Sequence, residues 1–117
     1  MSHARLESVG EGRFRVSGVL NASTATDVLE QSEAHFAQAP QIEVDLGGVG
    51  ESDSAGLALL IEWLRLARQS GRQIHFANVP AQIEALARIS EVEDLIGGSE
   101  KKETKEQEEK NENKKSG

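Results

Sequence analysis

The sequence predicts an α/β domain, a small four-stranded mixed β-sheet with helices packed on it. Segments with alternating apolar residues are interleaved with segments in which apolar residues recur every three or four positions. Two strand–helix–strand units follow one another in a short chain, which implies parallel strands joined by right-handed connections. Two short strands at the start, separated by Gly10-Glu11-Gly12, add an antiparallel hairpin.

The first half of the chain supplies three strands and one helix. Residues 5–9 and 13–17 form the expected hairpin, and Gly18 is expected to end its second strand. The capping residues of NASTAT (21–26) predict a helix near 23–39, which ends before Pro40. A third strand is expected where apolar and acidic residues alternate over 42–46. Residues 47–50, GGVG, are expected to form a flexible loop.

The second half begins with a long helix near 53–70. Its apolar residues share one broad face with Trp63 in the middle, and Ser70-Gly71 supplies the stop. A strand near 73–77 and a helix near 80–89 follow, and Ser90-Glu91-Val92-Glu93 resembles a capping box that opens a last helix near 91–97. The expected core contains Phe14, Val44, Leu46, Leu60, Trp63, Leu64, Ile74 and Leu86.

Composition divides the 117 residues into two parts. Residues 1–99, the expected domain, contain seven Arg, no Lys and fourteen Asp or Glu, which argues against nucleic-acid or anionic-membrane partners. Residues 100–117 contain six Lys, six Glu and no aliphatic or aromatic residue, so we expect a charged, disordered tail. The chain has no Cys and no apolar run of membrane-spanning length, so a cytoplasmic protein without membrane insertion is expected.

The main candidate site lies where the long helix starts. Ser52, Asp53 and Ser54 are all good N-cap residues, and Ser54 is expected in the first turn, beside unpaired backbone N–H groups. The simplest interpretation is that Ser54 only helps to cap the helix. A second is that its hydroxyl serves a partner or accepts a phosphate, which the positive end of the helix would stabilise.

No catalytic or metal-binding pattern accompanies this serine. The three histidines fall on different elements without ligand spacing, so no metal or other cofactor is expected. Ser54 has no histidine near it in sequence, which argues against a hydrolase. The glycines of 47–50 lack the Lys-Ser/Thr of a nucleotide-binding loop. A binding module is therefore favoured over an enzyme.

The strand VDLGGV, the motif Asp53-Ser54-Ala55-Gly56-Leu57 and the apolar helix after it resemble the STAS domain family. The resemblance covers nearly all of residues 5–97 and implies a non-catalytic domain with the same order of strands and helices. Many bacterial members carry Ser or Thr at the position of Ser54. In the anti-sigma factor antagonists, a partner kinase phosphorylates that serine and thereby switches binding.

The helix sequence LALL (57–60), continued by LAR (66–68), is similar to one branch of the family, the MlaB proteins. This similarity implies a cytoplasmic subunit, peripheral to the inner membrane, that binds and stabilises or regulates the ATPase of an ABC phospholipid transporter maintaining outer-membrane lipid asymmetry. The alternative is an anti-sigma factor antagonist whose partner is an anti-sigma factor kinase acting on Ser54. The transporter role implicates Ser54 and the region around Ser52, Asp53, Ala55, Ala58 and Ile61 as the partner contact, whereas the alternative implicates Ser54 as the phosphate acceptor.

Overall fold

A computed structural model of the chain describes residues 3–96. Its four-stranded sheet has the order β1-β2-β3-β4. The first two strands are antiparallel, and both β2–β3 and β3–β4 are parallel, which confirms the predicted mixed sheet. The strands are β1 (Ala4–Gly10), β2 (Arg13–Leu20), β3 (Gln41–Ser52) and β4 (Gln73–Ala77).

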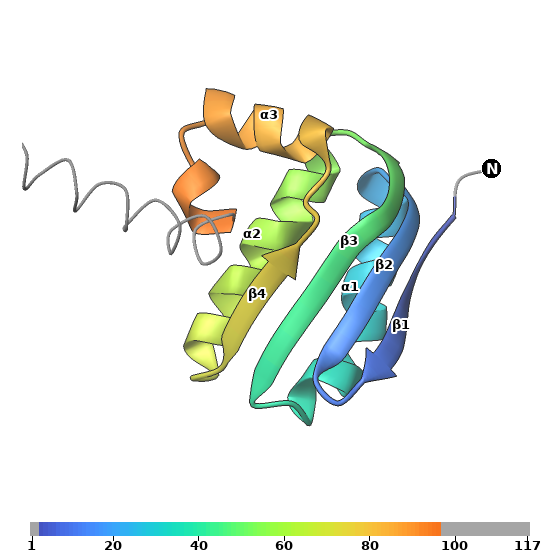
Figure 1. Cartoon of the computed structure of the whole chain (residues 1–117), viewed down its shortest axis with the longest axis vertical. Helices are drawn as coiled ribbons and strands as arrows, with labels where there is room; N and C mark the ends of the chain where they lie inside the picture. Colours follow the sequence, from blue (N-terminus) through green and yellow to red (C-terminus); the bar gives the residue numbers. More distant parts are fainter. Residues whose placement is uncertain (1–2, 97–117) are drawn as a thin grey trace, which may run out of the picture.

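Three helices connect or follow these strands. Figure 1 shows α1 and α2 together on one face of the sheet, and α3 beside the ends of α2 and β3. The opposite face of the sheet carries no helix in the described chain. No helix between residues 3 and 96 combines the length and the apolar character needed to cross a bilayer. The helices are α1 (Ala22–Ala37), α2 (Ser54–Gln69) and α3 (Ala81–Ile89).

Side-chain caps explain where the two long helices begin. Asn21 Oδ1 accepts hydrogen bonds from the backbone N–H groups of Ser23 and Thr24, and Thr24 Oγ1 accepts one from the Asn21 N–H. This reciprocal pair is a capping box, formed by the segment in which capping residues predicted the helix start. Asp53 caps α2, and Pro80 is the cap residue of α3 rather than its first helical residue.

The core fills the space between the sheet and the two long helices. Its aromatic rings form a chain in which Phe36 lies 5.1 Å from Phe14 and 5.4 Å from Trp63, measured between ring centroids. Of the eight expected core residues, five are buried: Phe14, Val44, Leu46, Leu60 and Trp63. The other three pack against the core while partly buried: Leu64, Ile74 and Leu86.

Two expectations about glycines are wrong. β2 does not end at Gly18 but continues to Leu20, and β3 runs through residues 47–50 as far as Ser52. Gly48 pairs with Ser17 in the β2–β3 ladder, where a Cβ would lie 2.9 Å from Ser17 Cβ and 3.0 Å from the Val16 carbonyl oxygen. Gly48 therefore lets the two strands approach closely, and residues 47–50 are part of β3 instead of a flexible loop.

The expected capping box at residues 90–93 is also absent. Ser90 ends α3 as its C-cap, and Glu91 has a left-handed backbone with φ of 62°. Helical backbone resumes only at residue 93 and lasts to 96, where Ile96 is buried. The end of the predicted last helix at residue 97 and the predicted disordered tail, 100–117, lie outside the described residues.

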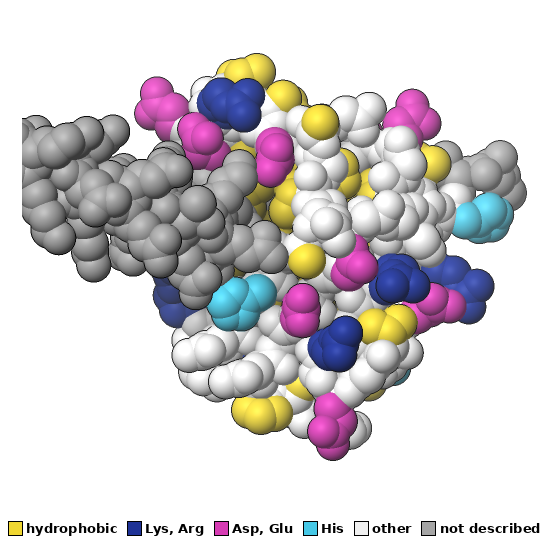
Figure 2. Space-filling model, in the orientation of Figure 1, with side chains coloured by type: hydrophobic (Ala, Val, Ile, Leu, Met, Phe, Trp, Pro, Cys, Tyr) yellow, Lys and Arg dark blue, Asp and Glu magenta, His cyan; other side chains and the backbone are white. Residues whose placement is uncertain are grey.

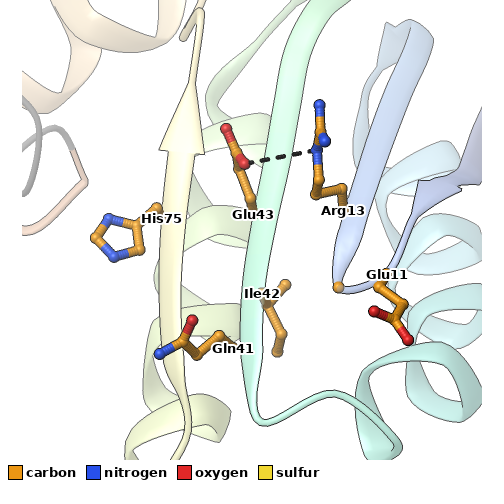
Figure 3. A pocket seen from close by; sticks show the side chains of 7 residues that line it. Glu11, Arg13, Gln41, Ile42, Glu43 and His75 are labelled. Carbon is orange, nitrogen blue, oxygen red and sulfur yellow. Dashed lines mark ion pairs between the residues drawn. The ribbon is translucent and has the colours of Figure 1, made fainter.

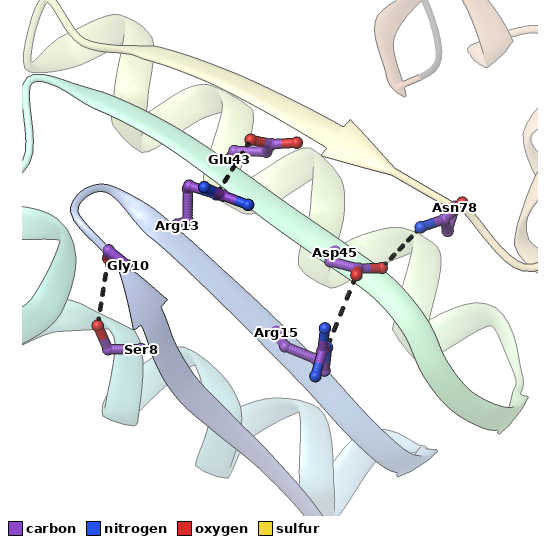
Figure 4. A network of polar contacts seen from close by, with 7 residues as sticks. All are labelled: Ser8, Gly10, Arg13, Arg15, Glu43, Asp45 and Asn78. Atoms are coloured by element: carbon purple, nitrogen blue, oxygen red, sulfur yellow. Dashed lines mark hydrogen bonds and ion pairs between the residues drawn. The ribbon is translucent and has the colours of Figure 1, made fainter.

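The open face of the sheet carries paired charges. Figure 2 shows acidic and basic side chains next to one another over this face. Arg13 on β2 lies 3.9 Å from Glu43 on β3, and Arg15 lies 3.6 Å from Asp45, two residues further along each strand (Figure 4). These cross-strand pairs leave the face polar and solvated.

Asp45 also holds the turn after β4. Its Oδ1 accepts a hydrogen bond from Asn78 Nδ2 at 2.9 Å (Figure 4) and another from the Gly47 N–H at 2.8 Å. The hydrogen bond from Asn78 is the largest cause that lowers the pKa of Asp45 below its ordinary value, followed by that from Gly47. Asn78 adopts a left-handed backbone, φ 57°, so Asp45 fixes the residue that turns the chain toward α3.

Candidate functional site at the start of α2

The site lies at the end of the sheet where β2 and β3 have their C-termini. Because these strands are parallel, the helices that follow them both begin at this end. The Asp53 N–H donates to the Leu20 carbonyl oxygen at 3.1 Å, so the last residue before α2 is fixed to the end of β2. The N-terminus of α2 is therefore held against the end of the sheet.

The cap of α2 is Asp53, and Ser54 is the first helical residue. Asp53 has an extended backbone and its Oδ1 accepts a hydrogen bond from the Ala55 N–H at 2.8 Å. Ser54 is exposed, and its hydroxyl makes no hydrogen bond within residues 3–96. The sequence expectation of an accessible Ser54 in the first turn agrees with this position.

Ser52 takes a different position from its neighbours. Only 9% of it is exposed, its N–H donates to Gln82 Oε1 of α3 at 3.0 Å, and its hydroxyl donates to the Asp53 carbonyl oxygen at 2.9 Å. The sequence grouped Ser52 with the partner-facing residues, but its side chain is buried and bonded inside the fold, so Ser52 is not part of the exposed surface. It joins β3, the α2 cap and α3.

Gly56 is a residue of the motif whose role the sequence did not reveal. A Cβ at this position would collide with Ser52 Oγ and would lie 3.1 Å from Ile83 Cδ1 of α3. Glycine thus lets the first turn of α2 pack directly on β3 and α3. The signal in the sequence was a glycine inside the first helical turn, where it carries an entropic cost and usually has a packing reason.

The outer face of α2 continues the site along the helix. Ala58 is exposed, and Ala55 and Ile61 are partly buried. Positions 54, 58 and 61 are one and two turns apart and therefore share a face. We call Asp53, Ser54, Ala55, Ala58 and Ile61 the Ser54 surface. It combines one hydroxyl and one carboxylate with small apolar side chains.

A charged pair follows the Ser54 surface on α2. Arg65 binds Glu62 through two hydrogen bonds, from Nε to Oε1 at 3.1 Å and from Nη2 to Oε2 at 2.6 Å. The hydrogen bond from Arg65 lowers the pKa of Glu62 and raises that of Arg65. The two charges satisfy each other, so they mark a polar boundary of the surface rather than offering a free charge.

Other features of the described chain lie apart from this surface. His35 packs against Phe14, with 5.6 Å between ring centroids, and His75 lies on β4. A hollow of about 430 Å³ on the open face is lined by residues of the β1–β2 turn, β3 and β4 (Figure 3). Residues 3–96 contain no group of three or more His, Asp or Glu side chains that could hold a metal ion.

Comparison with known proteins agrees with this geometry. The family model described as "Mlab, STAS domain" matches residues 4–97. The solved structure of the anti-sigma factor antagonist SpoIIAA in its unphosphorylated form superposes with a TM-score of 0.61 at 15% sequence identity, covering 78% of this chain and 83% of that chain. No curated protein matches the chain. The match over nearly the whole described chain, joined to the sheet order and the α2 N-terminus, shows that this protein belongs to the STAS domain family.

Proposed function

We propose that this chain is a non-catalytic STAS subunit that binds, and stabilises or regulates, the ATPase of an ABC phospholipid transporter maintaining outer-membrane lipid asymmetry. The observation that carries the proposal is the exposed Ser54 at the start of α2, in a chain whose matching family model is described as "Mlab, STAS domain". The ATPase would hold the chain at the cytoplasmic side of the inner membrane. The chain itself would not enter the membrane.

The Ser54 surface has the chemistry of a small docking site. Asp53 already satisfies the Ala55 N–H, and the Ser54 hydroxyl makes no hydrogen bond within residues 3–96, so it can donate or accept one across an interface. Ala58 carries only a methyl group, which lets a partner approach the helix closely. Ile61 adds apolar area whose burial would favour binding, at about 25 cal/mol per Å².

Rigid attachment of α2 supports the same role. The contacts of Asp53 with Leu20 and of Ser52 with Gln82 fix the helix start to β2 and α3 before any partner arrives. A preorganised surface loses little conformational entropy on binding, so more of its contact energy appears as affinity.

The proposal predicts that Ser54→Arg prevents co-purification with the ATPase subunit. The large side chain would obstruct the contact and place a positive charge at the positive end of the helix. The fold should survive, because an exposed change in the first turn costs no more than the loss of a cap, about 0.5–2 kcal/mol. Co-purification is measured together with the melting temperature of the isolated variant.

Ser70→Arg is the matched control. It places the same side chain at the other, exposed end of α2, where positive charge is favourable. We expect this variant to retain the ATPase. Full co-purification of a folded Ser54→Arg variant would show that the ATPase contacts another part of the chain, and the proposal would lose the residue on which it depends.

A second candidate function is that of an anti-sigma factor antagonist switched by phosphorylation of Ser54. The exposed Ser54 hydroxyl at a helix N-terminus favours it, since backbone N–H groups there stabilise a phosphate. The experiment is incubation with a candidate anti-sigma factor kinase and ATP, followed by mass spectrometry. Phosphate on Ser54, absent in Ser54→Ala, would support the switch, whereas an unmodified Ser54 would favour the transporter role.

A further inference from the structure

Most arginines of the described chain form an ion pair with a carboxylate, but two do not. All seven arginines of the chain lie within the described residues. Arg68 and Arg72 alone form no ion pair with a carboxylate in that part of the chain. The other five each lie within 3.9 Å of an acidic side chain: Arg5, Arg13, Arg15, Arg65 and Arg88.

The two unpaired arginines line the same hollow. It has a volume of about 390 Å³ and lies between the second half of α2 and β4. His75 also lines it, and the partly buried Leu64 and Ile74 supply apolar surface. Arg72 Nη2 donates to the Ala37 carbonyl oxygen at 3.0 Å, which restrains this guanidinium near the hollow. A basic hollow on a chain of net charge −7 selects for a negatively charged occupant.

The hollow follows the free edge of the sheet. β4 is the last strand of the sheet and pairs only with β3 in the described chain. The Gln73 N–H donates inward, to the Pro40 carbonyl oxygen at 3.3 Å. Because backbone polar groups alternate sides along a strand, the N–H and C=O of Ile74 point outward, away from β3. Figure 3 shows the His75 ring directed away from Glu43 and from the centre of the sheet.

We propose that this edge binds an extended acidic segment of another protein, which adds to β4 as a further strand. Side chains of an added strand would alternate between the two faces of the sheet. Those on the helix side would meet Arg68, Leu64 and Ile74, and those on the open side would meet His75. Backbone hydrogen bonds to Ile74 would supply affinity, and the arginines would select acidic side chains.

This edge is distinct from the Ser54 surface. α2 has 16 residues, so its two ends are about 24 Å apart at 1.5 Å per residue. Ser54 lies at the first end, and Arg68 and Arg72 lie at the second. Binding of an acidic strand therefore does not depend on the proposed function, and each of the two can fail alone.

The test uses the full chain, labelled with ¹⁵N, and the fluorescent peptide Glu-Val-Glu-Val-Glu-Val-Glu. We expect chemical-shift changes centred on residues 64–75 and a binding curve in fluorescence anisotropy. Arg68→Gln should weaken binding about tenfold, because one charge-assisted contact is lost. Arg65→Gln is the matched control, since it removes the same charge from α2 at a residue that pairs with Glu62, and it should bind like wild type.

Modified peptides test the strand geometry. Two versions carry N-methyl groups on alternate residues, one on the valines and one on the glutamates. At least one version should lose binding, because an added strand uses alternate N–H groups. Undiminished binding of both versions, or shifts located outside residues 64–75, would overturn the proposal. The proposal would also be overturned if inorganic phosphate bound at Arg68 and the peptide did not bind. It would likewise be overturned if the peptide bound only after the six glutamates of residues 100–117 were replaced by Gln.

Discussion

Trp63 is the residue through which α2 is joined to both α1 and the sheet. It is 1% exposed, and its ring lies 5.4 Å from Phe36 and 6.3 Å from Phe76 between centroids. Its Nε1–H donates to Ser32 Oγ at 2.9 Å. Helical periodicity predicted the burial, but not the polar partner, because Ser32 is 31 residues away in sequence and only the tertiary fold brings the two together.

Trp63→Ala should lower the free energy of unfolding by about 3–5 kcal/mol, because it leaves a large cavity and removes the hydrogen bond to Ser32. Chemical denaturation of both proteins measures the difference. Ile89→Ala is the control, since Ile89 is 78% exposed and a surface change of this kind costs about 0.5 kcal/mol or less. Equal losses in the two variants would contradict the packing described here.

The contact between Gly56 and Ser52 gives a second prediction at single positions. Gly56→Ala should lower the free energy of unfolding by about 1–3 kcal/mol, because the new methyl group collides with Ser52 Oγ. Ser52→Ala removes that oxygen, so the double variant should be more stable than the sum of the two single changes predicts. Additive losses in a double-mutant cycle would show that the collision is not the cause.

Ser52 and Ser54 show how far the site could be predicted from residue type. All three successive residues, 52–54, are competent caps; the sequence favoured Asp53 or Ser52 as the cap, with Ser54 in the first turn, but did not decide between those two. The choice depends on Leu20 and Gln82, which hold Asp53 and Ser52 from other elements. Exposure of Ser54 could be predicted from helical phase, whereas burial of Ser52 depends on contacts distant in sequence.

At the scale of elements, β3 is where local propensity and the fold disagree. Gly47, Gly48 and Gly50 have low strand propensity, so a loop was the natural expectation. In the fold, β2 runs alongside this stretch and pairs Ser17 with Gly48 and Gly18 with Val49, and the close approach of Ser17 to Gly48 excludes a side chain there. Ser17 and Gly48 are 31 residues apart, so their pairing cannot be seen from local sequence and the length of β3 could not be predicted.

The turn between β4 and α3 gives a pH prediction. The pKa of Asp45 is lowered in the folded state, so its ionised form stabilises the fold above the pKa of the unfolded chain, about 3.9 for Asp. That contribution is lost as pH falls from about 4 through the lower folded pKa. We therefore expect Asp45→Asn to be less stable than wild type at pH 7 and to approach it below pH 4. A difference in unfolding free energy that stays constant over this range would contradict the role of the carboxylate.

At the scale of the whole molecule, the sheet topology could be predicted from the order of elements. The hairpin and two crossovers required one antiparallel and two parallel pairs, and the structure has them. The last turn, residues 93–96, was harder, because Ser90 and Glu91 suggested a start but terminate α3 instead. The disordered tail, residues 100–117, stays a prediction from composition alone.

The central proposal is that the start of α2 faces the ATPase of an ABC phospholipid transporter. A photo-crosslinking amino acid placed at position 54, and separately at position 70 at the other end of α2, tests this in cells that contain both proteins. We predict a covalent adduct with the ATPase subunit from position 54 and none from position 70, identified by mass spectrometry. An adduct with the ATPase from position 70 alone, or an adduct at position 54 with an anti-sigma factor kinase instead, would contradict the account.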